Sequence, residues 1–317
     1  MKVCGYGGGL SSITALYFEN GEGAYCMNDR IKFSGHTMGT PDKDIYQVID
    51  CFSKIGYDGI EARVYHCKGE GDQASGQIDS ETITDDEALR IYEAAQARGL
   101  EFSCLTSYYK NFVLPEDRAY TIGNLQRVIQ IAALLHCPLI RVYGGQEAYE
   151  LTGVWFNDVW TKTVSGIREV AQYAAQYGVR VCIETHIGSL TMSVRDMVRL
   201  IEDVNMANVG MLFDYAWVEL AGVEQGRAAV DAAARHIFHV HMKDWKLISR
   251  TPLKKTSCLM GEGTVRWPEV FDELKKVGYT GYISDEYEKF WYPEELPDAE
   301  IGMKHNLEYA RSLVLGE

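Results

Sequence analysis

The sequence lacks long apolar segments and an excess of positive charge. No run of about eighteen apolar residues occurs, so no membrane-spanning helix is expected, and the opening residues MKVCGYGGGL lack the apolar segment of a secretory signal peptide. Lysine and arginine total 31 against 45 acidic residues, which gives a net charge of −14. A protein that binds duplex DNA normally carries a basic face, because neutralised phosphates supply much of its affinity. We therefore expect a cytoplasmic protein with neither a nucleic acid nor a membrane as a partner.

Cysteine pairs with zinc-binding spacing are also missing. None of the eight cysteines forms a CxxC pair, so a zinc site built from cysteines is not expected. Several lie inside apolar runs, such as FSCL at 102–105 and VCIE at 181–184, and are expected to be buried free thiols in a reducing compartment.

The 317 residues are 46 % apolar and 24 % charged, which is typical of a globular chain with one large domain or two ordinary ones.

Short apolar runs alternate with stretches of helical periodicity through most of the sequence. The apolar runs are rich in valine, isoleucine and aromatic residues on both faces, which is typical of strands covered on both sides. Strands are expected at 31–39, 59–65, 101–107, 139–145, 180–186, 209–215, 237–243 and 281–287. Helices are expected at 42–56, 84–99, 124–137, 160–178, 192–204, 226–236, 267–278 and 301–314.

This alternation predicts an α/β fold, a single (β/α)8 TIM barrel over residues 31–317. The competing fold, an open doubly wound sheet, is disfavoured because no GxGxxG motif follows the first strand. Residues 1–30 precede the first strand and form an N-terminal extension of unknown role. The polar stretch 66–83 follows the second strand, on the side where such barrels carry their active sites. It is expected to be either a lid or a flexible surface loop.

Acidic and imidazole side chains occur at the expected carboxyl ends of four consecutive strands. These are Glu184, Asp214, His241 and Glu286, and in a barrel they converge at one rim. Buried carboxylates this close together repel each other and lose hydration unless a cation compensates them. The mixed oxygen and nitrogen set suits one divalent ion, Mn²⁺, Mg²⁺, Co²⁺ or Zn²⁺. The sequence therefore predicts a metal site formed by these four residues.

The seventh strand carries two histidines and a lysine at alternate positions. His239, His241 and Lys243 lie on one side of the strand, and Val240 lies on the other. His241 is nearer the carboxyl end and is the expected ligand, whereas His239 lies one layer deeper and is expected to be a packing residue. Lys243 is expected to face the site as an acid or as a partner for a substrate oxyanion.

Several motifs resemble the xylose isomerase-like TIM barrels, the sugar phosphate isomerase/epimerase superfamily. The resemblance covers about residues 30–314 and is most specific in the last third. The matching stretches include HTMGTP at 36–41, GYDGIEAR at 56–63, CIETH at 182–186, HVHMKD at 239–244, and the segment from GEGTVRW to SDEYE at 261–288. The resemblance implies the same four metal ligands. It also implies that Glu184 and Glu286 transfer protons on opposite faces of a bound sugar, one removing the proton beside a carbonyl and the other returning one.

This resemblance implies a divalent-metal-dependent isomerase or epimerase of carbohydrate metabolism, acting on a ketose, keto-sugar or keto-cyclitol. The alternative is a lyase on the same scaffold, similar to inosose dehydratases or C-glycoside deglycosidases, because both reactions begin by removing a proton beside a carbonyl. A repair endonuclease of this fold would use more histidines than the eight present, and a non-catalytic sugar-binding barrel is a further alternative. No clear phosphate-binding loop opens a helix, which favours a non-phosphorylated substrate.

Further side chains at the expected strand ends are predicted to bind this substrate. They are His36, Glu61, Tyr108, Arg141, His186, Trp217 and Lys243. For two of them a structural role is the alternative: His36 as a polar residue of the barrel interior, and Glu61 as an ion-pair partner of Arg63 on the same face of the second strand. Similar barrels often form homo-oligomers, and the aromatic segment 290–292 is expected either at a subunit contact or over the catalytic mouth.

Two positions depart from the ketose 3-epimerases of this superfamily. Those enzymes carry a histidine three residues after the strand-six aspartate, where this chain has Trp217, and an arginine six residues after the metal histidine, where this chain has Leu247. Both departures count against a free-ketose 3-epimerase. Trp217 and Trp245 are expected either to stack on a sugar or cyclitol ring or to pack beneath the loops.

Overall fold

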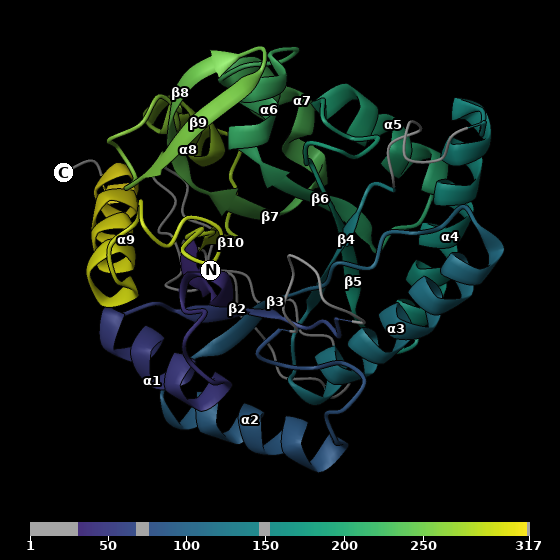
Figure 1. The fold of residues 1–317 in the computed structure, drawn as a ribbon, viewed down its shortest axis with the longest axis horizontal. Coiled ribbons are helices and arrows are strands. Elements are labelled where there is room, and N and C mark those ends of the chain that lie inside the picture. Colours follow the sequence, from purple (N-terminus) through teal and green to yellow (C-terminus); the bar gives the residue numbers. More distant parts are fainter. Residues whose placement is uncertain (1–30, 68–75, 146–152, 316–317) are drawn as a thin grey trace, which may run out of the picture. The chain divides into compact units, whose positions relative to one another are not determined.

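Parallel strands with helices around them form a closed barrel (Figure 1). The computed structural model describes residues 31–67, 76–145 and 153–315, and the extension at 1–30 lies outside them. The barrel strands are β1 (Lys32–His36), β2 (Gly59–Arg63), β3 (Glu101–Thr106), β4 (Leu139–Tyr143), β5 (Arg180–Glu184), β6 (Val209–Asp214), β7 (Ile237–Met242) and β10 (Tyr282–Asp285). Their order around the ring is β1, β10, β7, β6, β5, β4, β3, β2 and back to β1, with every pair parallel. The predicted (β/α)8 fold is confirmed.

Helices between successive strands surround the barrel (Figure 1). They are α1 (Ile45–Ile55), α2 (Asp85–Ala97), α3 (Pro115–Leu134), α4 (Phe156–Ala175), α5 (Val194–Val204), α6 (Tyr215–Ala221), α7 (Arg227–Ala233), α8 (Trp267–Lys276) and α9 (Ala299–Leu315). Local sequence signals mark the two ends of these helices, and α1 is an example. The Asp44 side chain accepts from the Gln47 N–H at 2.9 Å, and the Gln47 side chain accepts from the Asp44 N–H at 3.0 Å, which is a capping box. The helix ends at Gly56, whose φ of +100° is a left-handed conformation that glycine tolerates.

The barrel interior changes from apolar to polar along the strands. A separate buried apolar layer consists of Cys104, Leu139, Cys182 and Leu212. Two residues further toward the carboxyl ends of the same strands come Thr106, Arg141, Glu184 and Asp214. Because side chains two apart on a strand share a face, these polar residues lie above the apolar layer, at the rim of the barrel.

Several element bounds differ from the expectation. Residues 37–39, expected in the first strand, form one turn of 3₁₀ helix. Helix α3 begins at Pro115 rather than at residue 124, because a proline in the first turn needs no amide partner and the acids that follow it favour a helix N-terminus. Helix α6 is present in the structure but was not expected from the sequence. It begins directly after Asp214, whose side chain caps it by accepting the Trp217 N–H at 3.4 Å.

A hairpin that the periodicity does not predict follows the seventh barrel strand. Its strands β8 (Asp244–Arg250) and β9 (Leu253–Cys258) pair antiparallel, from Asp244 opposite Cys258 to Arg250 opposite Leu253. Most residues of both strands are exposed or only partly buried. The sequence did not indicate the hairpin, because a ribbon of this kind lacks the apolar runs of a buried strand.

Three smaller expectations concern thiols, a loop and membranes. The cysteines in the described residues are free thiols, as expected, and Cys51, Cys104, Cys137 and Cys182 are buried. Residues 68–75 of the polar stretch 66–83 lie outside the described residues, so its role as a lid or a surface loop stays a prediction. Over the described ranges, no helix has both the length and the apolar character needed to cross a membrane.

Candidate active site

The four side chains predicted as metal ligands come together at the carboxyl rim of the barrel. Glu184 ends β5, Asp214 ends β6, His241 lies on β7, and Glu286 follows β10. One possible ligand atom from each lies within 4.8 Å of the others, and all four residues are buried. His241 Nδ1 lies 3.2 Å from Glu184 Oε1 and 3.3 Å from Glu286 Oε2. The fold therefore gathers three carboxylates around one ring nitrogen.

Strand register explains this convergence. Asp214 pairs with His241 between β6 and β7, and His241 pairs with Ser284 between β7 and β10. The Glu286 N–H then donates to the Met242 carbonyl at 3.0 Å, which continues the pairing past the end of β10. Parallel neighbours end at the same rim, so residues far apart in sequence become neighbours there.

Two buried cations offset the negative charge of the cluster. Arg141 Nη1 lies 3.0 Å from Glu184 Oε2, while Lys243 Nζ lies 2.6 Å from Asp214 Oδ2 and also contacts Glu286. Burial alone would raise the pKa of Glu184, but Arg141, His241 and His186 together outweigh burial and lower that pKa to about 2. For Glu286, burial is likewise outweighed by Lys243, His241 and His36 together, and they hold the pKa well below its usual range. Burial dominates at Asp214 and raises its pKa to about 8.

The atoms of the cluster that make no hydrogen bond fit a divalent cation. Within the described residues, Glu184 Oε1 and Oε2, Asp214 Oδ2 and His241 Nδ1 are buried and make no hydrogen bond, and their close contacts are ion pairs with one another, with Arg141 or with Lys243. Buried polar atoms normally also make hydrogen bonds, so this cluster has capacity for a further partner. Carboxylate oxygens with one imidazole nitrogen are a donor set that Mn²⁺, Mg²⁺, Co²⁺ and Zn²⁺ accept. The residues present therefore fit the group that the resemblance implies.

A cavity of about 210 Å³ opens beside the cluster. Aromatic side chains form part of its lining: Tyr108, Tyr143, Trp217, Trp291 and Tyr292. Polar and charged side chains form most of the rest: Arg141, His186, Lys243, Glu286 and Glu288. Five predicted substrate-binding residues are thus in the lining, namely Tyr108, Arg141, His186, Trp217 and Lys243.

Further lining residues belong to segments that carry predicted site residues. Tyr143 lies two residues after Arg141 on the same face of β4, and this alternation makes it a candidate from the sequence as well. Trp291 and Tyr292 belong to the aromatic segment 290–292 and line the cavity, whereas a subunit contact of this segment stays a prediction. Glu288, two residues after Glu286 in the acidic run that follows the last barrel strand, lines the cavity with it.

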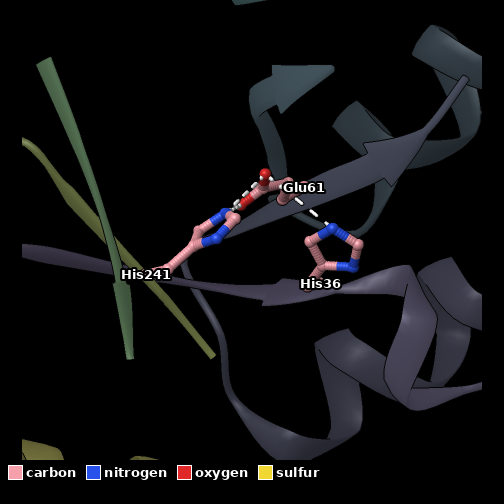
Figure 2. A group of neighbouring side chains, drawn as sticks. All are labelled: His36, Glu61 and His241. Carbon is pink, nitrogen blue, oxygen red and sulfur yellow. Dashed lines mark hydrogen bonds and ion pairs between the residues drawn. The ribbon is translucent and has the colours of Figure 1, made fainter. Parts of the chain in front are cut away.

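His36 and Glu61 lie in the barrel interior and not in the cavity lining. Figure 2 shows the Glu61 carboxylate between the rings of His36 and His241. His241 Nε2 lies 2.9 Å from Glu61 Oε1, His239 Nε2 lies 2.9 Å from Glu61 Oε2, and His36 Nε2 lies 3.9 Å from Oε1. Burial alone would raise the pKa of Glu61, but the histidines outweigh it and lower that pKa well below its usual range. His239, expected to be a packing residue, is buried and also bonds to a carboxylate.

The two tryptophans near the rim differ in position. Trp217 lines the cavity, and its indole Nε1 is buried without a hydrogen-bond partner in the described part of the chain. Trp245 is buried behind it, with the ring centres 4.8 Å apart. Lys255 of β9 adds a cation to this group, since its Nζ lies 4.5 Å from the Trp245 ring centre and 4.4 Å from that of Tyr292. Trp217 therefore meets the cavity, whereas Trp245 is a packing residue.

The sequence matches a known protein family over most of its length. The model of the family described as xylose isomerase-like TIM barrel matches residues 49–313. An inosose dehydratase of Yersinia enterocolitica is 25% identical over 219 residues, which are 61% of this chain and 72% of that enzyme. The chain spans between about half and seven-tenths of the length of the curated relatives it matches.

Solved structures share the fold at lower identity. The D-psicose 3-epimerase of Clostridium cellulolyticum H10 superposes with a TM-score of 0.70 at 16% identity, over 90% of this chain and 99% of that one. The IOLI protein, solved with a zinc atom, superposes with a TM-score of 0.72 at 16% identity, again over 90% of this chain and 99% of that one. At such identity these likenesses show the fold alone.

Proposed function

Because this chain belongs to the xylose isomerase-like TIM barrel family, we propose that it is a divalent-metal-dependent enzyme. Its reaction begins by removing a proton beside the carbonyl of a ketose, keto-sugar or keto-cyclitol, and the leading outcome is isomerisation or epimerisation. One observation carries the proposal: Glu184, Asp214, His241 and Glu286 converge within 4.8 Å, and Glu286 lines the adjoining cavity. These four residues would hold the ion. When bound, it would supply positive charge that stabilises the negative charge developing on a substrate oxygen.

In this proposal, Glu184 and Glu286 are the proton carriers. Glu286 lies in the cavity wall, and Lys243 keeps it ionised by direct contact. Arg141 does the same for Glu184 across 3.0 Å. In an epimerisation, one of the two ionised carboxylates accepts the proton beside the carbonyl. The other takes up a proton from solvent and then returns it to the opposite face. Arg141 and Lys243 position the two carboxylates and are unchanged by the reaction.

Substrate recognition is assigned to the cavity lining. Its volume of about 210 Å³ suits a small ring compound, and its aromatic side chains can pack against the apolar face of a sugar or cyclitol. Tyr108, Arg141, His186, Trp217 and Lys243 would contact the substrate. For His36 and Glu61 a direct substrate contact stays a prediction, as do a cytoplasmic location and a homo-oligomeric state.

The second candidate function is a lyase on the same scaffold. The similarity to an inosose dehydratase at 25% identity favours it, as do Trp217 and Leu247 where ketose 3-epimerases carry histidine and arginine. A lyase would use the same first proton transfer. It would then expel a hydroxyl group from the neighbouring carbon, with one carboxylic acid giving that group a proton.

Metal analysis combined with isotope exchange tests both functions. The purified protein is assayed for divalent ions and then incubated with a panel of ketoses and inososes in deuterium oxide. About one ion per chain and deuterium beside a carbonyl are expected. An epimerised product identifies an isomerase, whereas a dehydrated product identifies a lyase. A protein that binds no divalent ion even after reconstitution, and exchanges no proton, contradicts the proposal.

A further inference from the structure

The Glu61 carboxylate joins two strands that are not neighbours in the barrel. Glu61 lies on β2, and its partners His239 and His241 lie on β7, separated from β2 by β1 and β10 around the ring. All three side chains are fully buried. The bonds therefore cross the barrel interior beneath the rim, and none of them is part of the backbone pairing that forms the barrel.

The two nitrogens of His241 face different carboxylates. Nε2 lies 2.9 Å from Glu61 Oε1 and 3.0 Å from Oε2, whereas Nδ1 faces Glu184 at 3.2 Å and Glu286 at 3.3 Å. A carboxylate so close to Nε2 requires the proton to be on that nitrogen. Nδ1 also faces carboxylates, so it would carry a proton while no cation is bound, and a bound cation would take the place of that proton while the Nε2 proton stays with Glu61. The contact thus sets both the ring orientation and the tautomer.

Other donors hold Glu61 in place. The Thr106 hydroxyl donates to Oε1, and His239 Nε2 donates to Oε2 at 2.9 Å. His36 Nδ1 accepts from the Met38 N–H at 3.0 Å, so its proton is on Nε2, 3.9 Å from Glu61 Oε1 (Figure 2). The hydrogen bonds from Thr106 and His239 come from β3 and β7, and with the bond from His241 they leave the carboxylate little freedom to rotate. Glu61 is not in the lining of the cavity beside the cluster.

We propose that Glu61 is a positioning residue that orients His241 and fixes its tautomer, so that Nδ1 is presented to the cluster of Glu184, Asp214 and Glu286 as a metal ligand. The proposal rests on the proposed metal dependence and gives Glu61 a role other than contact with the substrate. Outer partners of ligating histidines typically contribute about 10–100-fold to metal affinity. Loss of Glu61 should therefore weaken metal binding by a similar factor.

The test compares Glu61→Gln with His239→Gln in the full chain. Mn²⁺ affinity is measured by calorimetry, and the ligand field of bound Co²⁺ by visible absorption, both without substrate. Glu61→Gln should weaken Mn²⁺ binding about 10–100-fold and alter the Co²⁺ spectrum. His239→Gln removes the second histidine from Glu61 but leaves His241 bonded to it, so Mn²⁺ affinity should change less than about threefold. Thermal melts of the metal-free variants report on folding separately.

Each other outcome overturns one specific claim. Wild-type affinity and spectrum in Glu61→Gln would show that Glu61 does not position His241. An unchanged metal affinity with a raised KM would make Glu61 a substrate contact instead. If Glu61→Gln does not fold, Glu61→Asp replaces it: the carboxylate stays but is one methylene shorter, and wild-type metal affinity in that variant would also refute the proposal. Failure of the wild-type protein itself to bind Mn²⁺ or Co²⁺ contradicts the proposed function.

Discussion

The apolar layer and the polar rim of the barrel interior are built by the same strands but have opposite chemistry. On β5, Cys182 lies in the apolar layer and Glu184, two residues later, in the rim. On β6, Leu212 and Asp214 repeat this step. One period of the strand, about 7 Å, thus separates a layer that stabilises the fold from a layer that can bind and react. Depth along the strand decides which role a buried residue takes.

Strand β7 differs from this pattern. It carries histidine at both levels, with His239 opposite Leu212 in the register and His241 opposite Asp214. A buried imidazole below the rim needs a partner, because an unpaired polar group in the interior is costly. Glu61 is that partner. At this position, a polar residue enters the lower layer where a carboxylate from another strand meets its Nε2.

The largest expected difference between the two layers is the loss of catalysis when the rim residue Glu286 is replaced. Glu286→Gln removes a proposed proton carrier while keeping its shape, so kcat should fall by about 10²–10⁴. The melting temperature should change little, because Lys243 keeps its contact with Asp214. Turnover on whichever substrate shows deuterium exchange is the measurement. Glu294→Gln, at an exposed position in the following segment, is the control, and equal activity in both variants would remove Glu286 from the mechanism.

The lower layer should show the opposite response. Leu212 is fully buried, and Leu212→Ala should lower the free energy of unfolding by about 2–5 kcal/mol through lost packing and a cavity. Mn²⁺ affinity of the folded variant should stay within about threefold. Urea unfolding measures the first quantity and calorimetry the second. Leu89→Ala, at a position 42% exposed on α2, should cost less than about 0.5 kcal/mol. A large loss of metal affinity in Leu212→Ala would mean that the two layers are not separable.

The smallest expected effect concerns the aromatic wall of the cavity, which is formed by Tyr108, Tyr143, Trp217, Trp291 and Tyr292. Trp217 lines the cavity, and its buried indole N–H has no partner among the described residues, so a substrate oxygen that reaches this nitrogen would satisfy it. Trp217→Phe keeps an aromatic ring and removes the donor, and KM should rise roughly two- to tenfold, as expected for one hydrogen bond. Trp245→Phe, behind the wall, should leave KM unchanged. Equal KM in all three proteins would leave Trp217 as a packing residue only.

Much of the fold, and the side of β7 on which the site residues lie, could be predicted from local patterns. Strict alternation of strands and helices predicted the barrel, and period-two spacing predicted that His241 and Lys243 share a side. The bounds of α3, the short helix α6 and the β8–β9 hairpin could not be predicted this way. The start of α3 depends on Pro115 and α6 on capping by Asp214, whereas the hairpin strands are largely exposed and lack the apolar runs of a buried strand.

The sequence by itself determined which residues reach the carboxyl rim. Parallel strands in a barrel end at one edge, so Glu184, Asp214, His241 and Glu286 could be placed together without coordinates. Only the tertiary structure decided how these residues are partnered. The pairs Arg141–Glu184, Lys243–Asp214 and Glu61–His241 depend on the register with which the sheet closes, including the irregularities at Ile60/Glu61 and Met211/Leu212. Periodicity within one strand carries no information about the offset between strands, and that offset selects the partner that each buried charge meets.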